Sequence, residues 1–283
     1  MIAPLPGWIA ASPSETREEA AFRSGAALAH LGLMTGQALV PQELWRARLA
    51  LSAAEVCAGL AGRREGQGAL RDAAHLTRPG DDPGPAGAIL HQWLRAVAPP
   101  ISVGHLGRAL PGVSADRIAL CLAAAGGTPV ERAAWVIEAV LADSPRAETV
   151  ALILADAVLA KSLGWNCVLP LMSLALKPRD IRLQGEELRL ACHRAVVAGA
   201  GQAVPLAADL ARAAARIRAV VPKLRARGAA RAVDLFLSHD AVAPAALAPF
   251  MSDRAARRLC DRLVDLGAVR ELTGRDAFRL YGV

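Results

Sequence analysis

The chain has 283 residues and a net charge of +7 at neutral pH; 54% of its residues are hydrophobic and 4% are aromatic. So high an apolar content excludes a disordered protein, and few aromatics beside abundant Ala and Leu exclude an all-β fold and favour a mostly α-helical one. The length suggests about two domains, and the basic charge permits binding to a polyanion without requiring it.

Capping signals predict many short to medium helices over residues 1–203. Thr16 and Glu19 have the spacing of a capping box, in which each residue satisfies a backbone N–H of the other at the start of a helix. The segment Thr128–Glu131 combines such a box with a proline at the first helical position. We therefore expect helices to begin after Thr16 and after Thr128.

Proline and glycine fill residues 78–85, which excludes a helix or a central strand there. Asp81 and Asp82 lie in this loop, and Asp72 precedes it on a helical segment. Three neighbouring carboxylates are a candidate enzyme site. The alternative is a solvated surface with local ion pairs.

The run from Pro145 to Leu163 is apolar on nearly every side, which predicts a central, buried helix. Asp156 lies within this run and would be buried with it. Because a buried carboxylate needs a partner, we expect an ion pair with an arginine of another helix. A catalytic acid is the alternative, although the sequence places no second catalytic group beside it.

The sequence becomes basic after residue 203, and Pro222 is expected to kink or divide this stretch. We interpret the chain as a helical domain over 1–203, a basic connector helix over 204–228 and a C-terminal unit over 229–283. The basic residues between Val204 and Arg231 are Arg212, Arg216, Arg218, Lys223, Arg225, Arg227 and Arg231.

The C-terminal unit has the pattern of three helices followed by a β-hairpin. The expected elements are helices over Ala229–His239, over Pro244–Phe250 and from Ser252 to Gly267, then strands over Ala268–Leu272 and Ala277–Tyr281. This is the order of a winged helix, whose third helix enters the major groove of DNA. Leu259 and Leu263 are expected to pack on the first helix and on Phe278.

Arginines crowd the N-terminal half of the third predicted helix, whereas Asp261 and Asp265 lie toward its end. This arrangement opposes the helix macrodipole, and contacts with phosphates or base edges would explain it. Asp253 and Arg257 also have the spacing of a local ion pair. Arg262 is expected near the apolar boundary, so its removal should have little effect on DNA binding. The predicted DNA-binding residues are Arg254, Arg257, Arg258 and Arg275.

The five cysteines form no C-x-x-C pair, and no histidines or cysteines have metal-ligand spacing. We expect no disulfide, metal or cofactor, and a cytoplasmic location. The N-terminus lacks the features of a signal peptide, and the most apolar run, residues 150–160, is too short to span a membrane. A soluble protein without a membrane partner is therefore expected.

Several segments along the chain resemble the domain-of-unknown-function family 1403, a bacterial family without an assigned activity. The similar segments are Ala61–Glu65, Ala69–Asp72, Arg78–Gly87, Ser252–Leu259, Gly267–Arg275 and Phe278–Tyr281. The resemblance spans nearly the whole chain but implies no mechanism. The C-terminal stretch is also similar to the winged-helix tail of Fic-type proteins, while the Fic catalytic motif is absent.

The sequence favours a DNA-binding protein, regulatory or replicon-associated, that uses a C-terminal winged helix. One alternative is a helical scaffold whose winged unit binds another protein or a second copy of the chain. Another is an enzyme with a carboxylate site near residues 72–82. Arginines without local ion pairs would favour DNA binding, and acids that converge in a cleft would favour the enzyme.

Overall fold

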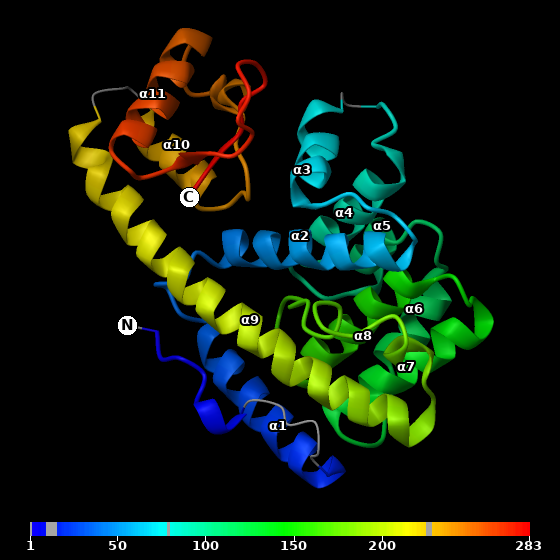
Figure 1. Ribbon diagram of the computed structural model, residues 1–283. Coiled ribbons are helices and arrows are strands. Elements are labelled where there is room, and N and C mark those ends of the chain that lie inside the picture. The colour runs from blue at the N-terminus through cyan, green and yellow to red at the C-terminus, as the bar shows by residue number, and fades with distance from the viewer. Residues whose placement is uncertain (1, 10–15, 78–79, 225–227) are drawn as a thin grey trace.

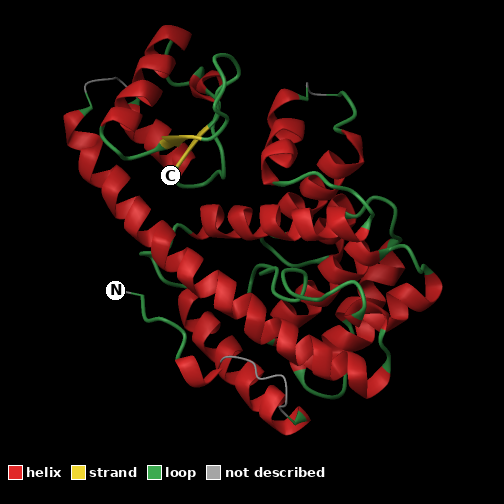
Figure 2. Ribbon diagram, viewed as in Figure 1, coloured by secondary structure: helices red, strands yellow, loops and turns green. Residues whose placement is uncertain are grey.

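The computed structural model describes residues 2–9, 16–77, 80–224 and 228–283. Within these ranges the chain is mostly α-helical, as predicted, with a small two-stranded sheet near the C-terminus (Figures 1 and 2). The α-helices are α1 (Arg17–Met34), α2 (Gln42–Leu60), α3 (Gln67–Leu76), α4 (Gly84–Ala96), α5 (Val103–Ala109), α6 (Ala115–Leu122), α7 (Pro129–Asp143), α8 (Glu148–Ser162), α9 (Gly185–Val220), α10 (Ala229–Phe236) and α11 (Asp253–Asp265). The 3₁₀ helices are η1 (Gly7–Ile9), η2 (Asp180–Arg182), η3 (Val221–Lys223) and η4 (Pro244–Leu247).

Local sequence determines where several helices begin. The Thr16 hydroxyl accepts the Glu19 N–H, and the Glu19 carboxylate accepts the Thr16 N–H at 2.8 Å, which completes the predicted capping box of α1. The segment Thr128–Glu131 starts α7 in the same way. The helix predicted from Pro145 begins instead at Glu148, because a turn precedes it.

Two hydrophobic clusters share the long helix α9, which crosses the molecule diagonally in Figure 1. The first cluster reaches from Ile9 to Leu210, and α8 is buried on every side within it, as predicted. The second begins at Ala214 and contains α10, η4, α11 and the sheet. The two cores therefore meet inside α9, beyond the boundary expected at residue 203. Pro222 lies just after the end of α9, in η3.

The sheet of the C-terminal unit is shorter than the predicted hairpin. Strand β1 (Arg270–Glu271) pairs antiparallel with β2 (Tyr281–Gly282), and Tyr281 also forms a bridge with Val242 on its other side. The connection over 272–280 is a long loop, because the Glu271 carboxylate accepts backbone N–H bonds within it and turns the chain.

Phe278 does not pack in the core of the C-terminal unit. Its φ is 56° and its side chain is 74% exposed, so the expected contact with Leu259 and Leu263 is wrong. The two leucines are buried as predicted, and Tyr281 lies with them in the hydrophobic cluster. A positive φ turns the Phe278 side chain away from the register that simple alternation predicts.

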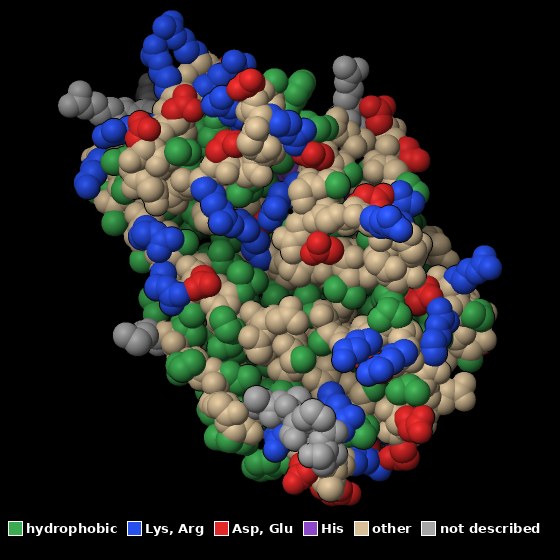
Figure 3. Space-filling view, viewed as in Figure 1, with side chains coloured by type: hydrophobic (Ala, Val, Ile, Leu, Met, Phe, Trp, Pro, Cys, Tyr) green, Lys and Arg blue, Asp and Glu red, His purple; other side chains and the backbone are tan. Residues whose placement is uncertain are grey.

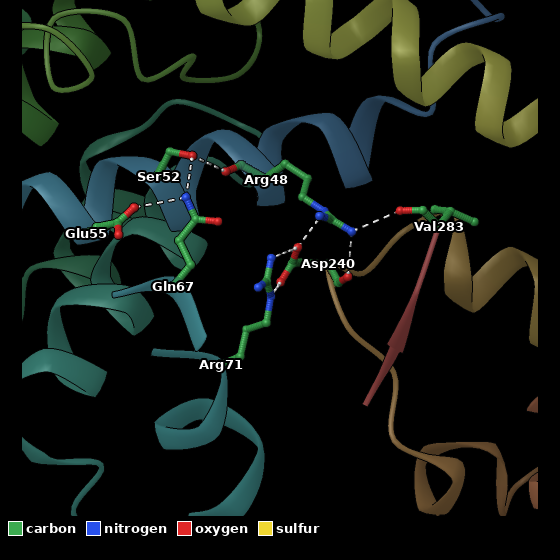
Figure 4. A network of polar contacts seen from close by, with 7 residues as sticks. All are labelled: Arg48, Ser52, Glu55, Gln67, Arg71, Asp240 and Val283. Atoms are coloured by element: carbon green, nitrogen blue, oxygen red, sulfur yellow. Dashed lines mark hydrogen bonds and ion pairs between the residues drawn. The ribbon is translucent and has the colours of Figure 1, made fainter. Parts of the chain in front are cut away.

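An ion-pair network joins the two parts of the molecule (Figure 4). Asp240 lies in the segment after α10. Its carboxylate forms ion pairs with Arg48, 2.5 Å from Nε to Oδ1, and with Arg71, 2.6 Å from Nε to Oδ2. Arg48 Nη2 also donates to the carbonyl oxygens of Asp240 and Val283. The three charged side chains are each at most 14% exposed, so these contacts fix the C-terminal unit against α2 and α3.

Within the described ranges, no helix has the length and apolar character that crossing a membrane requires. All five cysteines are free and buried. Burial raises the pKa of each thiol, including Cys57 to about 11, which keeps these thiols neutral at physiological pH. They act as small apolar side chains of the core.

Candidate nucleic-acid interface

Helix α11 is strongly amphipathic. The Ser252 hydroxyl accepts the Ala255 N–H and caps its first turn, as predicted. Ala256, Leu259 and Leu263 are buried in the second hydrophobic cluster, which fixes the rotation of the helix. The opposite face, which carries the arginines, is therefore held at the surface of the molecule.

A basic groove runs between η3 and one face of α11. Its cations are Lys223, Arg254, Arg258 and Arg262, and all four side chains are exposed. The groove has a volume of about 640 Å³, and no acidic residue lines it in the part of the chain that the structure describes. We call these four residues the basic groove.

The three arginines of the basic groove are four residues apart, so they form one stripe along the helix. Like charges at this spacing destabilise a helix by about 0.2–0.5 kcal/mol per pair. The described residues give the stripe no acidic partner within salt-bridge distance. An anion placed in the groove would relieve this repulsion.

The predicted DNA-binding residues fall into two groups. Arg254 and Arg258 lie in the basic groove. Arg257 instead forms an ion pair with Asp253, 2.9 Å from Nη2 to Oδ2, and Arg275 forms one with Asp72 of α3. The structure therefore leaves two of the four predicted residues available in the groove and gives the other two a partner within the protein.

Two residues of the basic groove were not predicted. Arg262 was expected near the apolar boundary, with little effect on binding; the structure shows it exposed and lining the groove. The signal for it was present, since Arg254, Arg258 and Arg262 repeat every four residues. Lys223 could be assigned to the groove only from the tertiary fold, which brings the end of η3 beside α11. Arg225 and Arg227 of the predicted connector lie outside the described residues.

Basic side chains are spread over the C-terminal unit in the space-filling view, at the upper left of Figure 3. Acidic side chains accompany them there, so the unit as a whole is not uniformly positive. Arg212, further back on α9, is paired with Asp209. The distinguishing feature of the groove is therefore the absence of acids among its described lining residues rather than the number of its arginines.

Two of the three carboxylates considered as an enzyme site have partners within the protein. Asp72 pairs with Arg275, and Asp82 Oδ1 accepts the Gly84 N–H at 2.8 Å. Asp81 is exposed in the same loop. Within the described residues, no group of three or more His, Cys, Asp or Glu side chains is arranged to hold a metal ion. This arrangement offers no observation in favour of catalysis.

Asp156 is completely buried, as predicted, but the expected arginine partner is wrong. Its carboxylate accepts the backbone N–H groups of Leu171, Met172 and Ser173 and the Ser173 hydroxyl, at 2.9–3.4 Å. Burial raises the pKa of Asp156 to about 6, against the opposing effect of these hydrogen bonds. The carboxylate thus holds a buried, irregular segment of backbone and has a structural role.

The fold and the site define a class: a mostly α-helical protein in which a C-terminal unit carries a basic groove beside one amphipathic helix. The chain belongs to the family of proteins of unknown function DUF1403, whose model matches residues 1–283. A comparison with curated proteins finds no match.

Proposed function

We propose that this protein binds DNA through its C-terminal unit, which we interpret as a winged helix. The order of elements supports the interpretation: α10, an extended contact at Val242, η4, α11 and a hairpin. Tyr281 of the hairpin lies between Val242 and Glu271, so the three segments form a minimal sheet beside the helices. In this arrangement α11 is the recognition helix.

The observation that carries the proposal is the basic groove. Phosphate contacts supply most of the affinity of a protein for DNA, and exposed arginines and lysines make them. Arg254, Arg258 and Arg262 form one stripe along α11, and Lys223 extends it onto η3. A helix with its side chains is about 10–12 Å in diameter, so α11 is narrow enough to enter the major groove, which is about 12 Å wide.

The residues outside the groove have a smaller part in the proposal. Arg257 and Arg275 were expected to contact DNA, and each is engaged by a carboxylate of the protein. An exposed ion pair is worth only about 0–1 kcal/mol, so DNA could compete for either arginine. We assign the primary phosphate contacts to Arg254 and Arg258, which need not leave a partner first.

The test compares two neighbouring arginines on one helix. Binding of a fluorescent duplex to the parent protein, to Arg258→Gln and to Arg257→Gln is measured over a salt series. The parent should bind with an affinity that falls steeply as salt rises. Arg258→Gln should reduce the log–log salt slope by about 0.9, the value for one lost phosphate contact, whereas Arg257→Gln should change it much less.

Circular dichroism of both variants checks that α11 remains folded. The proposal is wrong if the parent binds no duplex, or if Arg258→Gln and Arg257→Gln have equal slopes. In the first case the C-terminal unit is better interpreted as a protein-interaction module, which was the alternative that the sequence left open.

A further inference from the structure

A cavity of about 470 Å³ lies where the helical part of the molecule meets the C-terminal unit. Helices α2, α3 and α4 form its walls, and residues 238–241 close one side. The volume is within the usual range of about 300–1,000 Å³ for small-molecule sites. The site is separate from the basic groove, with which it shares no lining residue.

Arg46 is a charged residue of the cavity wall that lacks a charged partner. It is only 8% exposed, and its one hydrogen bond within the described residues joins Nη1 to Cys167 Sγ at 3.9 Å. Burial raises the pKa of the Cys167 thiol, so this contact is with a neutral group. A guanidinium that is little exposed and has no carboxylate beside it is a suitable partner for an anion in the cavity.

The remaining charges around the cavity do not neutralise Arg46. Asp240 lines the cavity, but Arg48 and Arg71 already share its carboxylate, as Figure 4 shows. Glu43, one turn before Arg46 on α2, also lines the cavity, is exposed and forms no salt bridge within the described residues. Of the two arginines that line the cavity, Arg71 is paired with Asp240, whereas Arg46 has no carboxylate within salt-bridge distance among the described residues.

The other side chains of the cavity are apolar or neutral. Burial is the main cause that lowers the pKa of His75 and of His91, which favours the neutral form of both imidazoles. Neutral imidazoles can each donate and accept a hydrogen bond. The larger apolar residues of the wall include Leu51, Leu90, Leu94 and Val97.

We propose that this cavity binds a small amphipathic carboxylate, with the carboxylate on Arg46 and the apolar body against the leucines of α2 and α4. A guanidinium binds a carboxylate through two parallel N–H···O bonds, which gives both charge and orientation. The histidines and Ser238 provide further polar contacts for substituents. This inference does not depend on DNA binding.

Octanoate is a suitable probe, and octanamide is its uncharged counterpart of the same shape. Isothermal titration calorimetry should give saturable binding of one octanoate per chain and at least tenfold weaker binding of octanamide. Arg46→Met, which keeps the length but removes the charge, should weaken octanoate binding by about tenfold or more and leave octanamide nearly unchanged. Arg64→Met, at an exposed position outside the cavity wall, is the matched control and should bind octanoate like the parent.

A second variant keeps the proposal testable if Arg46→Met fails to fold. Ala47 lines the same cavity, so Ala47→Phe should fill part of it and weaken both probes. The proposal is overturned if octanoate does not saturate a site, if octanamide binds as tightly as octanoate, or if Ala47→Phe leaves the binding of octanoate unchanged.

Discussion

Asp156 shows how one buried side chain can organise a segment without regular structure. Residues 167–174 are buried between α8 and α9, where their backbone N–H groups have no helix or sheet to satisfy them. The Asp156 carboxylate accepts three of these groups and the Ser173 hydroxyl. An unsatisfied buried N–H costs about 1–3 kcal/mol, so a carboxylate with several lone pairs is well suited to this position.

This environment predicts a pH dependence of stability. The pKa of Asp156 is about 6 in the folded protein and 3.8 ordinarily, so the folded state binds the proton more tightly. The resulting stability is fully present below about pH 4 and is lost as the pH rises through 6, a change of about 3 kcal/mol. Asp156→Asn cannot titrate, so urea unfolding should show the parent losing stability relative to this variant between about pH 4 and 7.

The control for the loss of a charge is Asp209→Asn, since Asp209 is exposed on α9. If the difference in unfolding free energy between the parent and Asp156→Asn is the same at about pH 4 and at about pH 7, the carboxylate does not titrate in this range. The predicted role of burial would then be wrong. An additional constant difference between the two proteins is expected, because an amide cannot accept all the donors that surround Asp156.

At the level of elements, α9 depends on a close approach that only glycine permits. A Cβ at Gly199 would lie 2.4 Å from the carbonyl oxygen of Leu171, in the segment that Asp156 holds. A Cβ at Gly201, on the exposed side of the same helix, would meet no atom within 4 Å. The two glycines therefore occupy opposite environments within one turn of one helix.

Alanine substitutions at these glycines should have opposite effects. Gly199→Ala should destabilise the protein by about 1–3 kcal/mol, because backbone must move to admit the methyl group. Gly201→Ala should stabilise it by about 0.5–1 kcal/mol, because alanine is the better helix former. Chemical denaturation measures both, and a stable Gly199→Ala variant would show that α9 does not pack on Leu171 as described.

The elements that the sequence predicted best are those whose signals are local. The capping boxes of α1 and α7 and the Ser252 cap of α11 act within one turn, so residue types alone determine them. The partner of Asp156 and the place of Lys223 depend on contacts between segments far apart in the chain, which no spacing reveals. Phe278 was misplaced because one residue with positive φ breaks the alternation of a strand.

The cavity and the basic groove differ in how many of their residues could be predicted from the sequence. Three of the four groove cations repeat every four residues on one predicted helix, so two of them were identified and the third could have been. The cavity is lined by residues of α2, α3, α4 and the segment after α10. Arg46 looks like any other helical arginine until the fold shows that it is buried beside a neutral thiol.

At the scale of the whole molecule, two hydrophobic cores are joined by α9 and by the ion-pair network at Asp240. Burial lowers the pKa of Arg48, and the charge of Asp240 opposes this effect. The carboxylate therefore keeps two adjacent guanidinium groups compatible with a largely buried position. Without it, Arg48 and Arg71 would repel each other across the junction.

Asp240→Asn should therefore loosen the C-terminal unit more than the rest of the protein. Removing one partner of a buried ion pair costs about 3–5 kcal/mol, because the charges that remain lose their counter-ion. The helical part keeps its own core. Relative to the parent, amide hydrogen exchange in the variant should therefore become faster in residues 229–283 and change less in residues 1–210. Asp276→Asn, at an exposed position of the same unit, is the control and should leave the exchange unchanged. Equal protection of both regions in Asp240→Asn would mean that α9 alone fixes the C-terminal unit, and the network would then contribute nothing to its docking.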